Sequence, residues 1–512
     1  MKKLGIYIIA LLIFAACSDD YLDRGSLTQL ASGNFWLTEQ DAQLGINGVY
    51  EALQNRSLYS GNLNGQAGIP QHDGLSDNLF NNYKFEGPGR YMEGNVEPAT
   101  PFFNNFWTSI YRGIGGANTA IENIALISDA NISSDARNDL MGQAYFLRAL
   151  FYMNLAIYFE EAPLILEVQT LENAYVPKNT YDELKAAIDD DFAKAIAALP
   201  VSRPQSDFGY ATRGAALSLA ARWHLYNKEY QQVADLTAQV MTMNYGLFNN
   251  YETLFSLAGE LSNEIVFSVR FIQDQSNNGE TFSSTFEGIP RVNDQPMPNL
   301  VDDYYCIDGL PISESPLYNP QNRKENRDPR LGASIYFQGD IFLIHLDRPF
   351  RGNTATRFGR KKYTRNNLSP EGIGVFPPGG QDYYLIRYAE VLLMRAEALA
   401  ELGQLGEVYE LVNQVRARVN MPAIEDVEGS GLGQGQLIDI IRHERRVELA
   451  FESLRFFDLK RWGTMESAYL RAAADPVGPY NPQYRGRRSE TFPIPQNELD
   501  ANRNLVQNPI WN

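Results

Sequence analysis

The stretch YLIRYAEVLLMRAEALAEL, residues 384–402, decides how this chain folds. Its apolar residues recur at helical spacing, and alanines at 389, 396 and 400 would let a second helix approach closely. A second helical stretch, 406–419, follows after a short glycine-containing turn. Paired helices of this kind are typical of tetratricopeptide units, which stack so that neighbouring pairs bury one continuous core.

Further helix pairs are predicted upstream, over 134–243. The stretch 134–158 is apolar on nearly every side, which indicates a helix buried between others. The stretch 180–199 is amphipathic, with Thr180 as its N-cap and Glu183 as the capping-box partner. Two shorter helices, 214–226 and 230–243, follow it.

A long helix is also predicted over 437–462, which completes the second repeat region, 384–462. It contains a charge-rich run, from Arg442 to Glu448, that resembles catalytic machinery at first sight. Because its charges recur at i, i+3 and i+4 spacing, we interpret the run as an ion-pair network on one helix.

Three long segments resist a helical interpretation: 55–100, 244–380 and 472–488. The middle one is rich in Pro, Gly and Asn and has short strand-like runs at 264–271 and 333–337. Long irregular loops in a compact protein are usually functional. The predicted fold is therefore mostly α, a tetratricopeptide-like helical-repeat scaffold with long irregular loops and a few short strands.

Composition excludes several functions. The formal charge is −18, and removing Lys2 and Lys3 with the first 16 residues takes it to −20. So acidic a chain does not suit nucleic acid or anionic lipid surfaces, which attract clustered Lys and Arg. The chain has two cysteines, Cys17 and Cys306, and once residue 17 is modified it can form no internal disulfide.

The N-terminus reads as a secretory signal peptide. Two lysines precede an apolar run, 4–16, that is shorter than the ~20 residues needed to cross a bilayer. Cys17 follows two alanines, which resembles a lipobox, where this cysteine becomes the lipidated first residue of the mature protein. Three residues before the cysteine, where a lipobox usually has an aliphatic residue, this chain has Phe14, a mild departure from the pattern. The competing interpretation is an ordinary signal peptide with an incidental cysteine.

We find no convincing catalytic or metal site. Two carboxylate groups, Glu160-Glu161 and Asp189 to Asp191, could flank a glycosidic bond, but both lie at helical positions and suit a solvated face better. The four histidines are scattered without metal-ligand spacing, and no nucleotide-binding or nucleophile-elbow motif is present. We expect no enzyme activity, no metal and no cofactor.

Several segments in order resemble the SusD/RagB family of surface lipoproteins. They run from one end of the chain to the other: 35–42 with 47–50, 117–122, 144–150 with 163–164, 328–330, 386–398, 442–463, 492–495 and 507–509. The resemblance implies a signal peptide at 1–16 and one SusD-like domain at 17–512. The acidic residues 18–20 look like the export tag that sends such lipoproteins to the cell surface in Bacteroidetes.

The resemblance also implies a function. Family members capture a nutrient beside a SusC-like TonB-dependent transporter, held by lipid in the outer membrane and facing the cell exterior. Their helical scaffold faces the transporter. Ligands are usually oligosaccharides or polysaccharides, although some members are thought to take peptides, and the family is not enzymatic.

Ligand contacts are not part of the shared motifs, so we predict them from chemistry. Sugar sites combine an aromatic platform with planar polar side chains that bind hydroxyl groups. The candidates are two loop-rich groups: Asp73, Asp77, Asn78, Tyr83, Arg90 and Tyr91 in the first irregular segment, and Arg291 and Asp294 in the middle one. Packing within loops is the competing interpretation for each single aromatic residue.

Two other functions remain open from sequence. One is a lipid-anchored glycan hydrolase, which the lack of a convincing carboxylate pair opposes. The other is a repeat scaffold that binds only protein and no small ligand.

Overall fold

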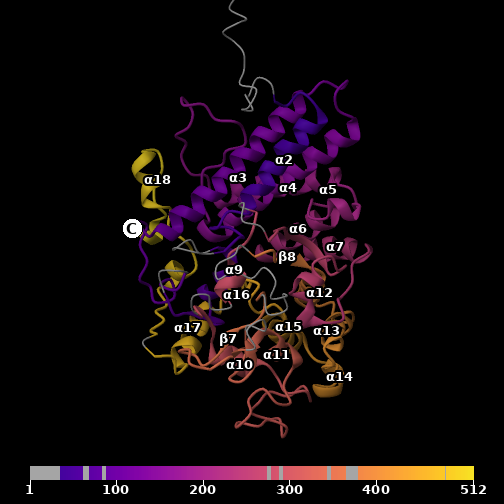
Figure 1. The fold of residues 1–512 in the computed structure, drawn as a ribbon, viewed down its shortest axis with the longest axis vertical. Helices are drawn as coiled ribbons and strands as arrows, with labels where there is room; N and C mark the ends of the chain where they lie inside the picture. Colours follow the sequence, from indigo (N-terminus) through magenta and orange to yellow (C-terminus); the bar gives the residue numbers. More distant parts are fainter. Residues whose placement is uncertain are drawn as a thin grey trace, which may run out of the picture.

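A computed structural model describes residues 35–61, 68–83, 88–273, 278–286, 292–342, 348–364, 379–478 and 480–512. Cys17 and Arg291 lie outside the described residues. Figure 1 shows a helical molecule in which α2 to α5 form one end, and α6, α7, α12 and α13 continue along one side. Within the described residues, none of the helices is long and apolar enough to cross a membrane.

The helices fall into a repeat scaffold and a set of short helices. The scaffold helices are α2 (Glu39–Leu53), α3 (Pro101–Leu126), α4 (Ser134–Phe159), α5 (Tyr181–Ala198), α6 (Arg213–Tyr226), α7 (Tyr230–Met241), α12 (Tyr388–Glu401), α13 (Val408–Arg418) and α15 (Gln434–Glu448). The others are α8 (Tyr251–Leu254), α9 (Phe282–Phe286), α10 (Pro298–Asp303), α11 (Pro329–Ser334), α14 (Ile424–Val427), α16 (Arg455–Trp462), α17 (Met465–Ala474) and α18 (Gln496–Ala501).

Helices that follow one another in the scaffold pack side by side, which confirms the tetratricopeptide-like prediction. The contacts run from α3 through α4 and α5 to α6 and α7, and then through α12 to α13 and α15. α4 is buried along most of its length, as its apolar sequence indicates. The capping box at the start of α5 is formed, with the Thr180 backbone N–H donating to Glu183 at 2.8 Å. Ala389, Ala396 and Ala400 are fully buried in α12.

Strands are short and pair two by two among the described residues. The antiparallel pairs are β1 (Leu79–Asn81) with β3 (Asp294–Pro296), β2 (Ile265–Val269) with β8 (Tyr383–Arg387), β4 (Ile335–Tyr336) with β7 (Gly359–Arg360), and β5 (Ile341–Phe342) with β6 (Arg348–Pro349). The stretch 384–402 therefore differs from the prediction in its first residues. They extend β8 beside β2, and the helix begins only at Tyr388.

The helix predicted over 437–462 is also wrong as one element. α15 ends at Glu448, and α16 begins at Arg455. Between them Phe451 and Ser453 have positive φ angles of 65° and 62°, which interrupt a helix. The buried Phe451 N–H donates to Asp73, so a tertiary hydrogen bond replaces the helical one.

Candidate functional site

The first and middle irregular segments meet in the fold. Strand β1 pairs with β3 through Leu79 with Pro296 and Asn81 with Asp294. Just beyond β1, the Tyr83 backbone N–H donates to Asn293 Oδ1 at 2.7 Å. The structure thus joins two segments that are far apart in the sequence and that both contain predicted ligand residues.

The segment around Arg90 packs against the end of β1. Gly89 lies so close that a Cβ on it would be 2.6 Å from the Asn81 Cβ. The next residue, Arg90, is exposed, and Tyr83 is half-buried. Tyr83 and Arg90 therefore both lie at this end of the β1–β3 pair.

The third irregular segment joins them. The Gln483 N–H donates to the Met92 carbonyl at 2.7 Å, and the Tyr480 ring lies edge-on to Phe80 of β1, with centroids 4.9 Å apart. We call the surface where the three segments meet the irregular face. Among the described residues, those of this face that are partly or fully exposed include Asn82, Tyr83, Arg90, Asn95, Tyr480 and Asn481.

The chemistry of this face suits a polar ring-shaped ligand. Tyrosine rings offer flat apolar surfaces, and the asparagine amides and the arginine supply hydrogen bonds in fixed planes. Tyr480 and Asn481 were not among the predicted ligand residues. The run Tyr-Asn-Pro-Gln-Tyr at 480–484, two tyrosines in a segment without helical periodicity, was the signal that could have found them.

Most of the predicted ligand residues lie beneath this face instead of on it. The buried ones, which contact other protein groups, are Asp73, Asp77, Asn78, Tyr91 and Asp294. The Asp73 carboxylate accepts from the Phe451 N–H, and burial raises its pKa to about 6. The Asp294 carboxylate accepts from Asn81 Nδ2 at 2.5 Å. These buried residues support the irregular face through their contacts with other protein groups. Tyr83 and Arg90 remain as the candidates for ligand contact.

Tyr91 is 2% exposed and belongs to an aromatic core. Its ring lies edge-on to Phe456 and Phe492, with centroids 6.1 and 5.2 Å away. Its hydroxyl donates to the Arg488 carbonyl at 3.2 Å. The loop-packing interpretation therefore holds for this tyrosine.

Asp77 is fully buried and forms ion pairs with three arginines. Arg455 Nε, Arg471 Nη2 and Arg446 Nη2 lie 2.9, 2.8 and 3.2 Å from its carboxylate oxygens. Burial acts to raise the pKa of this carboxyl, but the three guanidinium groups outweigh it and hold the pKa far below the usual value of 3.8. Asp77 therefore stays charged, and Asn78 accepts from Arg446 Nε at 3.1 Å beside it.

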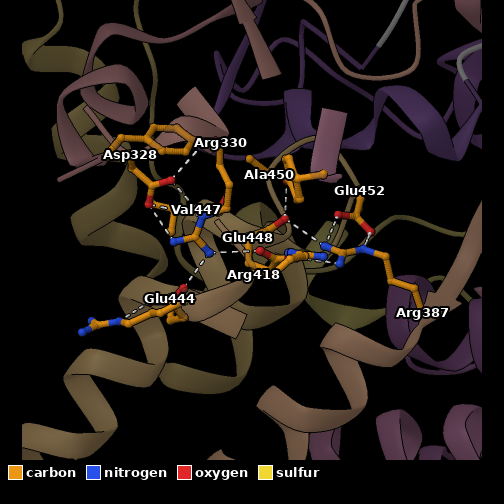
Figure 2. Close-up of polar contacts among 12 residues, drawn as sticks. Asp328, Arg330, Arg387, Arg418, Glu444, Val447, Glu448, Ala450 and Glu452 are labelled. Carbon is orange, nitrogen blue, oxygen red and sulfur yellow. Dashed lines mark hydrogen bonds and ion pairs between the residues drawn. The ribbon is translucent and has the colours of Figure 1, made fainter. Parts of the chain in front are cut away.

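The charged run on α15 forms buried ion pairs with other elements, which corrects the one-helix interpretation. Glu448 contacts Arg387 of β8 at 2.6 Å, Arg330 of α11 at 3.0 Å, and Arg418 of α13 (Figure 2). Glu444 contacts Arg330 at 2.5 Å and Arg416 at 2.9 Å. The i, i+4 spacing aligns Glu444 and Glu448 on one face, but that face meets neighbouring elements and not solvent.

This ionic core is electrically balanced within the described residues. Its cations are Arg330, Lys362, Arg387, Arg416 and Arg418, and its anions are Glu264, Asp328, Glu444, Glu448 and Glu452. Three segments that carry the family resemblance, 328–330, 386–398 and 442–463, thus meet in one structural cluster. With every charge paired, its arrangement indicates a role in folding.

The carboxylate groups considered for glycan hydrolysis are likewise tied to protein partners. Glu160 contacts Lys460 at 3.0 Å, and Asp191 accepts twice from Arg148 at 2.8 Å. Asp189 accepts from Trp223 Nε1 at 2.7 Å. Across the part of the chain that the structure describes, no group of three His, Cys, Asp or Glu side chains is placed to hold a metal ion.

Comparison with known protein families gives two matches. The model described as "SusD family" matches residues 263–511, and the model described as "Starch-binding associating with outer membrane" matches residues 46–225. Two SusD-like proteins of Formosa agariphila are similar along almost their whole length. One is 25% identical, covering 100% of this chain and 99% of its own, and the other 27%, covering 93% and 92%.

Solved structures give the same fold. A SusD-like carbohydrate-binding protein from Bacteroides fragilis superposes with a TM-score of 0.80 at 28% identity, over 92% of this chain and 100% of its own. A surface glycan-binding protein from Bacteroides thetaiotaomicron, in complex with laminarihexaose, superposes with a TM-score of 0.72 at 19% identity, over 92% and 99%.

Proposed function

This chain belongs to the SusD family, and on that premise we propose that it binds an oligosaccharide or polysaccharide at the irregular face and delivers it to a TonB-dependent transporter. The observation that carries the proposal is the meeting of three irregular segments in one surface with tyrosine rings, amides and an exposed arginine. The carbohydrate-binding relative from Bacteroides fragilis, 28% identical over its full length, supports the ligand class.

Binding is tested by titrating the protein from Ser18 onward against hexaoses of the laminarin, starch, xylan and mannan series, and against peptides of similar length. We expect a hexaose to bind. Binding of peptides alone would instead support the peptide-capturing alternative, and binding of neither class would overturn the proposal. Release of reducing ends from a bound glycan would favour the hydrolase.

Replacing Tyr83 and Arg90 together by alanine is expected to weaken hexaose binding at the irregular face about tenfold or more, because it removes one ring face and one charged hydrogen-bond donor. Isothermal titration measures the loss. The matched control is Tyr175 with Arg503, both exposed and both replaced by alanine. Equal affinity in the two double variants would show that these two residues do not contact the ligand.

We further propose that Cys17 carries lipid and anchors the protein in the outer membrane. A tether beside the transporter raises the effective concentration of captured ligand at its entrance. The family description "associating with outer membrane" supports the outer membrane as the location, and the apolar run before Cys17 supports lipid attachment at that cysteine.

Replacing Cys17 by alanine is expected to abolish incorporation of a palmitate analogue and to release the protein from the membrane fraction. Cys306, which is fully buried, provides the control, since its replacement by alanine should leave the label in place. Label retained in the Cys17 variant would contradict the anchor.

A further inference from the structure

Two cavities lie at the loop between α5 and α6, and neither is lined by the residues that define the irregular face. One has a volume of about 430 Å³ and the other about 340 Å³. Both are lined by Phe208, Gly209, Tyr210 and Ser268. We call the two cavities together the α5–α6 groove. Its size lies within the range of small-ligand sites.

The Phe208 ring is held in place by Arg270, a partly exposed residue that is itself paired with a buried carboxylate. The Arg270 guanidinium carbon lies 5.0 Å from the ring centroid, and Arg270 Nη1 donates to the Phe208 carbonyl at 3.2 Å. Arg270 Nε in turn lies 2.5 Å from the fully buried Asp382 carboxylate. The ring is half-buried, so it is fixed without being enclosed.

The Tyr210 ring has the same kind of support. The Arg203 guanidinium carbon lies 5.9 Å from its centroid, and Arg203 Nη1 donates to Asp139 at 2.9 Å. The Tyr210 hydroxyl donates to Asn47 Oδ1 at 2.9 Å, and Tyr50 lies edge-on to the ring at 5.3 Å. Two half-buried rings, two residues apart, are thus each fixed by an arginine that a carboxylate holds.

Gly209 makes the close approach between this loop and Arg270 possible. Its φ is 106°, which side-chain-bearing residues rarely adopt, and a Cβ there would be 2.6 Å from the Arg270 Cγ. The loop therefore has a specific backbone at a residue that lines both cavities.

The other polar groups of the groove are amides, hydroxyl groups and the two carboxylates of Glu51 and Asp207. The amides are Asn47, Gln54, Gln205, Asn244, Asn263 and Asn278. The two arginines pair with Asp139 and Asp382, and the carboxylates of Glu51 and Asp207 also line the groove, so the groove does not select a strongly anionic ligand. Fixed aromatic rings with amides around them are suited to a neutral ring that carries hydroxyl groups, and holding the rings in advance lowers the entropy cost of binding.

We propose that the α5–α6 groove is a second saccharide site, separate from the irregular face, in which a sugar ring lies against Phe208 or Tyr210. This inference rests on the proposed carbohydrate-binding function. It adds a second place on the scaffold side, between the end of α2, the α5–α6 loop and β2, where a longer glycan or a second chain would be held.

The test counts sites with the same hexaose panel. In the variant with Tyr83 and Arg90 replaced by alanine, we expect residual hexaose binding, measured by titration and by native mass spectrometry. Adding Phe208→Leu should weaken that residual binding about tenfold, because leucine keeps the apolar volume but removes the flat ring face. Phe208→Tyr, which keeps the ring, is the matched control, and thermal unfolding checks that each variant is folded.

The outcomes separate this inference from the proposed function. Complete loss of binding in the Tyr83 and Arg90 variant, or no effect of Phe208→Leu in a folded protein, overturns the second site and leaves the irregular face. Binding that depends on Phe208 but not on Tyr83 and Arg90 supports the groove and overturns the irregular face. A wild type that binds none of the hexaoses overturns both.

Discussion

Replacing Glu448 by glutamine is expected to lower the free energy of unfolding by about 3–5 kcal/mol, the usual cost of leaving buried charge unpaired. Glu448 is fully buried and contacts Arg330, Arg387 and Arg418. Glutamine has nearly the same shape, so the variant removes the charge and hardly changes the packing. The balanced ionic core would then hold one excess positive charge away from solvent.

Urea unfolding, followed by circular dichroism, measures the effect. Glu410→Gln is the matched control, because Glu410 is an exposed helical glutamate and should change stability by no more than about 0.5 kcal/mol. A loss at Glu448 as small as that of the control would mean that water or neighbouring groups screen the ionic core, contrary to its burial.

The helical scaffold could be predicted from sequence because its signals are local. Apolar spacing marks α4 to α7, and Thr180 with Glu183 marks the start of α5. The break after α15 could not be predicted, since residues 449–454 contain no Gly or Pro. It depends on tertiary hydrogen bonds, from the Phe451 N–H to Asp73 and from Ser453 Oγ to the Ile69 carbonyl.

The candidate site could be predicted only as a region. The irregular segments were recognisable, and the structure brings them together at β1 and β3. The sequence does not show which polar side chains face solvent, because their exposure depends on residues that are far away in the chain. Asp77 and Tyr83 are six residues apart, yet Asp77 is buried by arginines of α15, α16 and α17 while Tyr83 stays partly exposed.

Replacing Asp77 by asparagine is expected to lower the free energy of unfolding by about 3–5 kcal/mol and to leave the hexaose affinity of the folded protein unchanged. Stability falls because Arg446, Arg455 and Arg471 lose the carboxylate they share. Among the described residues, only Arg446 keeps another ion-pair partner, Asp303. The hexaose affinity is unchanged because the Asp77 carboxylate is buried and faces those arginines. Asp439→Asn, an exposed aspartate on α15, is the control.

The pH dependence of stability gives an independent check on the same residue. The pKa of Asp77 in the folded protein lies below its ordinary value of 3.8, so this group stabilises the fold above pH 3.8 and loses that contribution as the pH falls further. Wild type should therefore lose stability between pH 5 and pH 2 more steeply than Asp77→Asn, with urea midpoints as the readout. Converging curves with unchanged hexaose affinity would establish that Asp77 supports the irregular face without contacting the ligand. Parallel curves together with weaker hexaose binding in the variant would instead indicate that Asp77 contacts the ligand.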